Sequence, residues 1–211
     1  MIGVFELFGG GVLLLSAAIA VLTLGNFEPR RALLLILAQK YRWAAPDIII
    51  AGDSLAAGCP FAELSRRPFA VLSLARGGAT LQEIAAQLSQ AREIAAQWVV
   101  IDGGLNDILS DDASPMEVER DFRVLLRRLG DGKKAIFTLM PHISDPAYAA
   151  RIDAANERIA ALCAQHGVAV LDLNPDLSCD GARRPEMTDD GLHFTPRANA
   201  VWIAATRRMT G

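Results

Sequence analysis

From Pro46 onward, short apolar runs alternate with longer stretches of helical spacing. The runs, rich in Val and Ile, are Asp47–Ala51, Phe69–Ala75, Trp98–Asp102, Ala135–Met140 and Val168–Leu173. The helical stretches are Thr80–Ala96, Ser114–Leu129, Asp145–His166 and Thr195–Met209. Strands that are apolar throughout are covered on both faces, which is typical of a parallel sheet between two helical layers. The pattern therefore predicts a three-layer α/β/α domain with about five parallel strands.

The first part of the chain has a different pattern. Residues Ile2–Phe27 contain one ionisable side chain, Glu6, and the stretch Phe8–Gly25 carries no charge. Because about 20 apolar residues cross a bilayer as a helix, this segment predicts a transmembrane anchor. A cleaved signal peptide is one alternative, but its basic first region is missing from MIGVFE. A buried core helix is the other alternative, although such a long run without a polar face is unusual in a small domain.

A second apolar block follows between charged residues. Ala32–Ala38 lies between Arg30 and Arg31 on one side and Lys40 and Arg42 on the other. It is either a short juxtamembrane helix at the lipid interface or an ordinary helix packed on the domain. We therefore expect an anchor at 1–27, a juxtamembrane helix or linker at 28–45, and the α/β domain at 46–211.

Composition narrows the class of protein. The 211 residues carry a formal net charge of −3, with 52% apolar and 21% charged residues and a mean hydropathy of +0.25. These values suit one compact domain and exclude a disordered chain. The mild acidity argues against a nucleic-acid partner. Three cysteines are too few and too widely spaced for a zinc cluster.

Polar segments follow each of the five predicted strands. In order they are Gly52–Leu55, Arg76–Thr80, Gly103–Asp107, Pro141–His142 and, after a longer loop, Asp190–His193. In open parallel sheets, functional groups collect at the carboxyl ends of the strands. We therefore expect these five segments to meet at one edge of the sheet.

The residue types at this edge favour acyl transfer. A serine nucleophile needs a general base, usually His, and a carboxylate that orients the base. Ser54, His193 and Asp190 could supply these groups, since Asp190 and His193 are three residues apart. A tetrahedral oxyanion also needs N–H donors. The main-chain amides of Ser54 and Gly78 and the side chain of Asn106 are the candidates, and glycine at 78 would allow close backbone approach.

The same segments resemble the SGNH, or GDSL, hydrolases over roughly four-fifths of the chain. Gly52-Asp53-Ser54-Leu55 is similar to the first family block, Gly78 to the second, Gly104-Leu105-Asn106-Asp107 to the third and Asp190-Gly191-Leu192-His193 to the last. The resemblance implies a flavodoxin-like sheet of five parallel strands. It also implies the nucleophile, base, orienting acid and oxyanion donors given above.

One position departs from the family pattern. Family members often have Asp after the oxyanion glycine, whereas this chain has Ala79. Either Gly77 or Gly78 could therefore supply the second amide donor.

Several alternatives compete with these assignments. Gly52-Asp53-Ser54-Leu55-Ala56 is one substitution short of the Gly-x-Ser-x-Gly elbow of α/β-hydrolases, but that reading leaves Asn106 without a role. A metal site from Asp190, His193 and His142 would have only scattered ligands. His142 is either a substrate contact or a loop histidine. Asp53 and Asp107 are expected to brace loops, and we expect neither a metal nor another cofactor.

The leading hypothesis is a serine esterase that acts on an acyl-ester substrate. Removal of small O-acyl groups from carbohydrate or envelope substrates is favoured, because the small domain shows no obvious lid insertion. The alternatives are a lipid acyl esterase of the lysophospholipase or thioesterase kind, a sugar O-acetyltransferase, and a non-catalytic envelope binding module.

The sequence contains opposing signals on location. The anchor would hold the protein at a membrane, and the resemblance to envelope-acting enzymes favours a domain outside the cytoplasm. The basic residues after the apolar run favour the opposite side, although this rule weakens when a whole domain is translocated. Cys59 and Cys179 should lie at the same sheet edge, so they are either a disulfide of an oxidising compartment or two free thiols.

Overall fold

A parallel sheet forms the centre of the domain. The computed structural model describes residues 45–211 except residues 68 and 131. The sheet has five strands in the order β2-β1-β3-β4-β5, and every neighbouring pair is parallel. The strands are β1 (Ile48–Ala51), β2 (Val71–Ser73), β3 (Trp98–Asp102), β4 (Lys134–Thr138) and β5 (Ala169–Leu171). The predicted α/β fold class with five parallel strands is confirmed.

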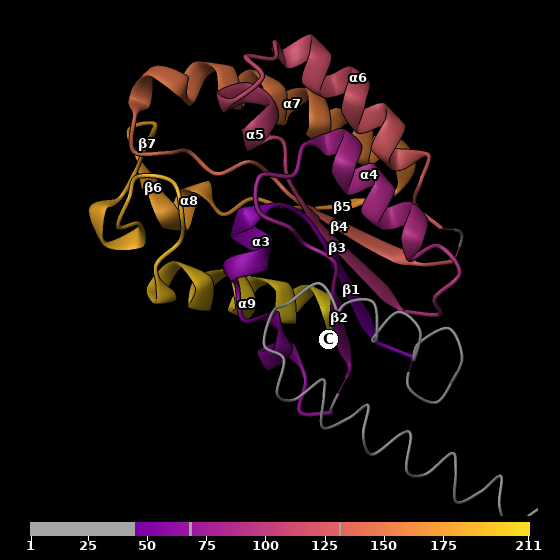
Figure 1. Cartoon of the computed structure of the whole chain (residues 1–211). Helices are drawn as coiled ribbons and strands as arrows, with labels where there is room; N and C mark the ends of the chain where they lie inside the picture. The colour runs from indigo at the N-terminus through magenta and orange to yellow at the C-terminus, as the bar shows by residue number, and fades with distance from the viewer. Residues whose placement is uncertain (1–44, 68, 131) are drawn as a thin grey trace, which may run out of the picture.

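Helices cover both faces of this sheet (Figure 1). One layer consists of α4 (Leu81–Gln90), α6 (Pro115–Leu126) and α7 (Ala149–His166), which pack side by side. The other face is covered by α9 (Pro196–Thr210) together with the 3₁₀ turn η2 (Phe61–Leu64). Trp202 of α9 is fully buried, packs edge-on against Phe61 and donates its indole N–H to Thr138 Oγ1 of β4 at 3.1 Å. The result is the expected three-layer arrangement.

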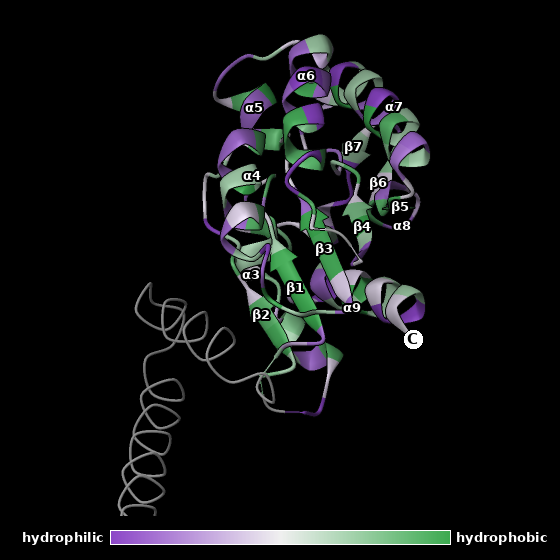
Figure 2. Cartoon of the chain, turned by 90° about the vertical axis from the view of Figure 1, so that its right-hand side faces the viewer, coloured by the Kyte–Doolittle hydropathy of each residue, from purple (hydrophilic) through white to green (hydrophobic). Residues whose placement is uncertain are grey.

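Hydropathy explains this layering. In Figure 2, β1 and β3 are hydrophobic along their length, whereas α4, α6 and α7 combine hydrophobic and hydrophilic residues. All four residues of β1 are buried, as are the last four of β3. Phe137 of β4 packs against Phe122 of α6 with ring centroids 4.7 Å apart, which joins the sheet to the helical layer. Each helix therefore buries one apolar stripe against a sheet that has no polar face.

The element ends differ from the predicted ones by a few residues. β2 is shorter than predicted, because Phe69 has a left-handed backbone (φ +62°) that is incompatible with a strand. α4 ends at Gln90, and the predicted remainder forms turns. Two of the long helices begin with a cap: Ser114 accepts the Glu117 N–H in a capping box, and Thr195 accepts the Ala198 N–H.

Short elements that the sequence pattern did not predict complete the domain. Two of them directly follow strands: α3 (Ser54–Gly58) follows β1, and α5 (Leu105–Leu109) follows β3. The others are η3 (Pro146–Tyr148), α8 (Asn174–Leu177), the antiparallel pair β6 (Ser178–Cys179) and β7 (Ala182–Arg183), and η4 (Pro185–Met187). With five residues each, α3 and α5 are too short to show a helical period.

The predicted anchor at 1–27 and most of the predicted juxtamembrane segment lie outside the described residues. Within residues 45–211, without 68 and 131, no helix combines the length and the apolar character that crossing a bilayer requires.

Candidate active site

Three side chains that are far apart in sequence meet at the carboxyl edge of the sheet. Ser54 Oγ lies 3.0 Å from His193 Nε2, and His193 Nδ1 lies 2.6 Å from Asp190 Oδ2. Ser54 is the first residue of α3, directly beyond β1, while His193 and Asp190 belong to the loop before α9. The structure thus brings together the predicted nucleophile, base and orienting acid in hydrogen-bonding sequence.

The local backbone around Ser54 explains its position. Asp53 is the N-cap of α3, and its Oδ1 accepts the Leu55 N–H at 2.9 Å. The preceding residue, Gly52, exchanges two hydrogen bonds with the buried Gln87 side chain of α4, at 2.9 and 3.0 Å. A side chain at 52 would collide with Ala56, since an added Cβ would lie 2.7 Å from the Ala56 Cβ. The strand-to-helix turn that presents Ser54 is therefore held by α4 on the strand side and by the Asp53 cap on the helix side.

The loop that carries the base is organised around the Asp190 carboxylate. Its Oδ1 accepts the N–H groups of Leu192 and His193 at 2.9 and 2.7 Å, while Oδ2 faces the imidazole. The imidazole and these two amides hold the pKa of Asp190 well below its usual range. Asp190 therefore stays ionised and can orient His193, although both side chains are about half exposed (55% and 49%).

The amide of Asn106 on α5 is directed toward the same edge. Its Nδ2 donates to Ala79 O at 3.0 Å and to Asp53 Oδ2 at 3.3 Å. Both hydrogens of this group thus have protein acceptors in the substrate-free structure. The bond to Asp53 is the longer of the two.

Gly78 lies in a tight turn beside this group. The Ala79 N–H donates to Arg76 O at 3.3 Å, and Gly78 occupies the third turn position with φ +73°. That conformation is the reason for glycine, because a Cβ at 78 would meet nothing within 4 Å. The close backbone approach that we expected of this glycine concerns a bound substrate, and it stays a prediction. An added Cβ at Gly77 would lie 3.9 Å from the Ser54 Cβ, so Gly77 borders Ser54.

A second carboxyl group lies beneath Asp53. Asp102, the last residue of β3, is 2% exposed and hydrogen-bonded to Asp53, which is 1% exposed. Burial and the neighbouring carboxyl group raise the pKa of Asp102, since two buried charges in contact cannot both be ionised. Burial raises the pKa of Asp53 as well, so the two carboxyl groups favour a state in which they share one proton, while Asp53 also accepts from Asn106. A carboxylate that ends an otherwise apolar strand is the sequence signal for this pair, and our sequence analysis missed it.

Arg183 on β7 is the second residue that sequence reasoning missed. It is 3% exposed, its Nη1 donates to Leu192 O, and its guanidinium lies 4.5 Å from the centre of the Phe194 ring. Leu192 and Phe194 are the two neighbours of His193, so Arg183 contacts the loop on both sides of the base. Burial lowers the pKa of Arg183 to about 10, which still leaves it charged at neutral pH. No pattern in the sequence separates this arginine from exposed ones.

The other predicted residues have structural partners. His142 is buried, and its Nε2 lies 2.7 Å from Asp153 Oδ1 of α7. Its role as a substrate contact stays a prediction. Asp107 braces α5 against α4 by accepting the Leu81 N–H, at 3.1 Å to Oδ2. Burial raises the pKa of Asp107 to about 6.

The cysteines in this part of the chain are free thiols. Cys59 and Cys163 are buried, Cys179 is exposed, and none forms a disulfide. Of the two states that the sequence left open, the structure has the unpaired one. Among the residues that the structure describes, no three or more His, Cys, Asp or Glu side chains are grouped to hold a metal ion.

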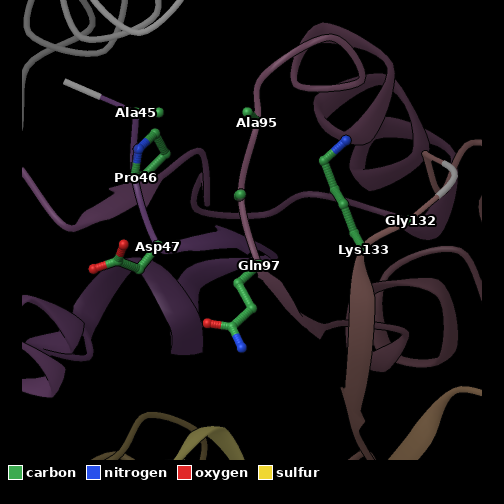
Figure 3. A pocket seen from close by; sticks show the side chains of 8 residues that line it. Ala45, Pro46, Asp47, Ala95, Gln97, Gly132 and Lys133 are labelled. Carbon is green, nitrogen blue, oxygen red and sulfur yellow. The ribbon is translucent and has the colours of Figure 1, made fainter. Parts of the chain in front are cut away.

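A hollow of about 470 Å³ lies at the opposite end of the sheet (Figure 3). Asp47, Gln97 and Lys133 line it, and these residues directly precede β1, β3 and β4. Because Ser54 follows the far end of β1, this hollow is not part of the candidate active site.

Comparison with known families agrees with this arrangement. The model of the GDSL-like lipase/acylhydrolase family matches residues 50–201, which include Ser54, Asp190 and His193. The chain belongs to this family. The protein is accordingly an ester hydrolase, and the resemblance drawn from its four sequence blocks is confirmed.

Solved structures of other proteins share the fold. A lipase/acylhydrolase from Enterococcus faecalis superposes with a TM-score of 0.63 at 20% identity, over 78% of this chain and 94% of that one. An aryl esterase from M. smegmatis gives a TM-score of 0.62 at 18% identity, over 78% and 98% of the two chains.

Curated relatives are similar in sequence over a shorter stretch. N-acylneuraminate cytidylyltransferases of Streptococcus agalactiae are 30% identical over 127 residues, which is 59% of this chain. The match spans only 30% of the relatives' own length. This chain therefore corresponds to a minor part of the proteins that carry this name.

Proposed function

We propose that this GDSL hydrolase removes small O-acyl groups from carbohydrate substrates, with Ser54 as nucleophile. The observation that carries the proposal is the Ser54–His193–Asp190 chain of hydrogen bonds at 3.0 and 2.6 Å. Distances of this size place a nucleophile and a base within direct proton-transfer reach.

The reaction follows from these positions. Ser54 Oγ attacks the acyl carbon while His193 Nε2 takes the hydroxyl proton, and ionised Asp190 stabilises the resulting imidazolium. The main-chain amides of Ser54 and Gly78 and the Asn106 side chain donate to the oxyanion, for which Asn106 exchanges its Asp53 bond. His193 then protonates the leaving alcohol. A water molecule, deprotonated by His193, attacks the acyl-enzyme, and its collapse releases the acid and restores Ser54.

Two observations support a short acyl group on a sugar. His193 and Asp190 are about half exposed, so a bulky alcohol can reach the triad, whereas a long acyl chain needs an apolar channel. The curated relatives are named for an acylated sugar acid. The stretch that they share with this chain is 30% of their length, so the activity in their name can belong to the remaining part and a second activity to the shared stretch.

Covalent labelling tests the nucleophile. A fluorophosphonate probe should label the full chain in detergent, and Ser54→Ala should abolish both labelling and ester turnover. Ser110→Ala, which removes an exposed hydroxyl after α5, is the matched control and should retain both. Likewise His193→Ala should lose turnover by roughly 10³-fold or more, while His166→Ala should not. Near-normal turnover by a folded Ser54→Ala protein would overturn the mechanism.

A substrate series tests the acyl group. Turnover of p-nitrophenyl esters should fall steadily from acetate to longer chains, and O-acetylated sugars should release acetate. Preference for long chains would instead indicate a lipid esterase. Transfer of acetyl groups to added sugar without net hydrolysis would indicate a transferase.

We also propose that the N-terminal segment anchors the enzyme to a membrane, with the α/β domain outside the cytoplasm. The uncharged stretch Phe8–Gly25 supports the anchor. Alkaline carbonate should leave the full chain in the membrane pellet. Protease added to intact spheroplasts should digest the domain, and a domain protected until lysis would refute the outward placement.

A further inference from the structure

The two edges of the sheet differ in charge. Exposed or half-buried cationic residues collect where the strands begin, and we name six of them the basic edge: Arg67, Arg92, Arg127, Arg128, Lys133 and Lys134. The carboxylates described at this edge are Asp47, which pairs with Arg67 at 2.8 Å, and Glu93. Asp131, which lies outside the described residues, adds a third in the sequence. Cations are therefore in clear excess at this end.

Contacts join three of these cations. Lys133 Nζ donates to the Arg92 carbonyl at 2.7 Å, and Arg92, Arg128 and Lys133 border one crevice. Lys134 Nζ lies 5.0 Å from the centre of the Trp98 ring. Of the basic edge, Lys133 lines the hollow of Figure 3, on the wall opposite Asp47.

The catalytic edge is richer in carboxylates. Exposed carboxylates follow the strands there, among them Asp111, Asp112, Asp145, Asp172 and Asp189. The cations Arg76, Arg151 and Arg197 lie at this edge as well, and Arg151 pairs with Asp112 at 2.6 Å. Cations at helix C-termini stabilise the helix dipole, which accounts for Arg92, Arg127 and Arg128 in part. Arg67 and Lys134 lie beside strand starts, so the helix dipole does not account for them.

The chain also enters the domain at this edge. Ala45 and Pro46 line the hollow, directly after a segment that contains Arg30, Arg31, Lys40 and Arg42 and follows the uncharged stretch Phe8–Gly25. The cationic surface is thus the part of the domain that adjoins the proposed anchor.

We propose that the basic edge rests on anionic phospholipid headgroups and turns the active site away from the bilayer. Cationic groups near such a surface bind it through its negative potential, which decays within about 8 Å in physiological salt. Asp47 and Ser54 are joined by β1 and a short turn, which span roughly 20 Å at about 3.3 Å per residue. The acidic edge therefore stays beyond the range at which the surface would repel it.

This orientation deepens the proposed function, on which it rests. An active site held away from the bilayer reaches acyl groups on soluble or envelope carbohydrate, and it does not reach the ester bonds of the supporting bilayer.

Lipid quenching of a dye at each edge tests the orientation. The full chain is placed in nanodiscs of phosphatidylcholine alone, or of equal parts phosphatidylcholine and phosphatidylglycerol, both with nitroxide on the headgroups. One sample is labelled at native Cys179, at the far end of the domain. The other is labelled at Ser89→Cys, at the end of α4, in a Cys179→Ser background. Buried Cys59 and Cys163 do not react in the folded protein.

Phosphatidylglycerol should increase quenching of the Ser89→Cys label at least threefold and leave the Cys179 label unchanged. The triple variant Arg92→Glu, Arg127→Glu, Arg128→Glu should lose the increase, whereas the same three positions changed to Lys should keep it. Equal quenching at both labels, or equal loss in the Glu and Lys variants, would overturn the proposal. A third result would also overturn it: quenching that does not depend on lipid charge, together with binding of the chain to heparin. That combination would identify a soluble polyanion as the partner.

Turnover of a soluble aryl ester in the same nanodiscs separates this inference from the proposed function. The Glu variant should hydrolyse that ester at the wild-type rate. A wild-type chain that is oriented but inactive would refute the proposed function and leave the surface standing, and an active chain without orientation would do the reverse.

Discussion

The two halves of the catalytic site are held in different ways. The nucleophile half consists of Ser54 and the groups around Asp53, and it is built on buried strand ends. Gln87 is hydrogen-bonded to Gly52 there, and Asn106 to Asp53. The base half, Asp190 and His193, lies on a loop with both side chains about half exposed. The nucleophile half is held in place by the sheet. The base half is held by a few specific contacts, above all those of Arg183.

Asn106 tests the buried half most directly. Asn106→Ala should lower kcat by about 10²–10³ with a smaller change in KM, because an oxyanion donor acts mainly in the transition state. Asn106→Asp keeps the side-chain shape but removes the N–H donors, so it should lose as much. Steady-state kinetics on an aryl acetate measures both. A change confined to KM would place Asn106 in ground-state binding instead.

Arg183 tests the loop half. Arg183→Met keeps much of the side-chain volume but removes the bond to Leu192 O, so His193 should lose its fixed orientation. We expect kcat to fall about tenfold, which corresponds to about 1.4 kcal/mol. Arg183→Lys, which retains a donor and a charge, should recover part of the loss.

The pH profile separates a positioning role of Arg183 from general destabilisation. A displaced base should change the pH dependence of kcat/KM, whereas lower stability alone should not. Unchanged kinetics in a folded Arg183→Met protein would show that the loop holds itself in place.

Asp102 links the buried half to stability. Because its pKa is raised in the folded state, the folded protein keeps a proton that the unfolded chain releases at about pH 4. The contribution of Asp102 to the free energy of unfolding therefore falls as pH rises from that value through the folded pKa. Asp102→Asn donates to Asp53 without titrating, so it should be more stable than wild type at pH 8 and similar at pH 4.

Urea unfolding at the two pH values measures this difference. Glu157→Gln, which removes an exposed carboxylate of α7, is the control and should change neither value. An equal effect of Asp102→Asn at both pH values would contradict proton sharing between Asp102 and Asp53.

The thiols give the smallest expected effect. Cys179→Ser should leave activity and the free energy of unfolding unchanged, with or without reductant, because the exposed thiol has no disulfide partner among the described residues. Iodoacetamide should modify Cys179 in the folded domain, and Cys59 and Cys163 only after unfolding, since burial raises the pKa of both buried thiols. Oxidation that protects Cys179 in the folded protein would contradict this.

Pattern and motif together predicted much of the fold and most of the candidate site. The apolar runs near 48, 98 and 134 became the central strands, because a strand buried on both faces leaves a continuous apolar signature. Ser54, Asn106 and His193 could be assigned because each follows an element at the sheet edge in a recognisable block. The short helices α3 and α5 were missed, since one turn of helix shows no period.

The sequence by itself determined the layered α/β fold, the order of the polar segments and the identity of the triad candidates. Each of these follows from local periodicity or from short motifs. Only the tertiary structure showed that Asp102 lies beneath Asp53, that Arg183 contacts both neighbours of His193, and that the cations gather at the edge where the chain enters. These are contacts between segments far apart in the chain. Their energies come from burial and from charges brought together by folding, which no single stretch of sequence displays.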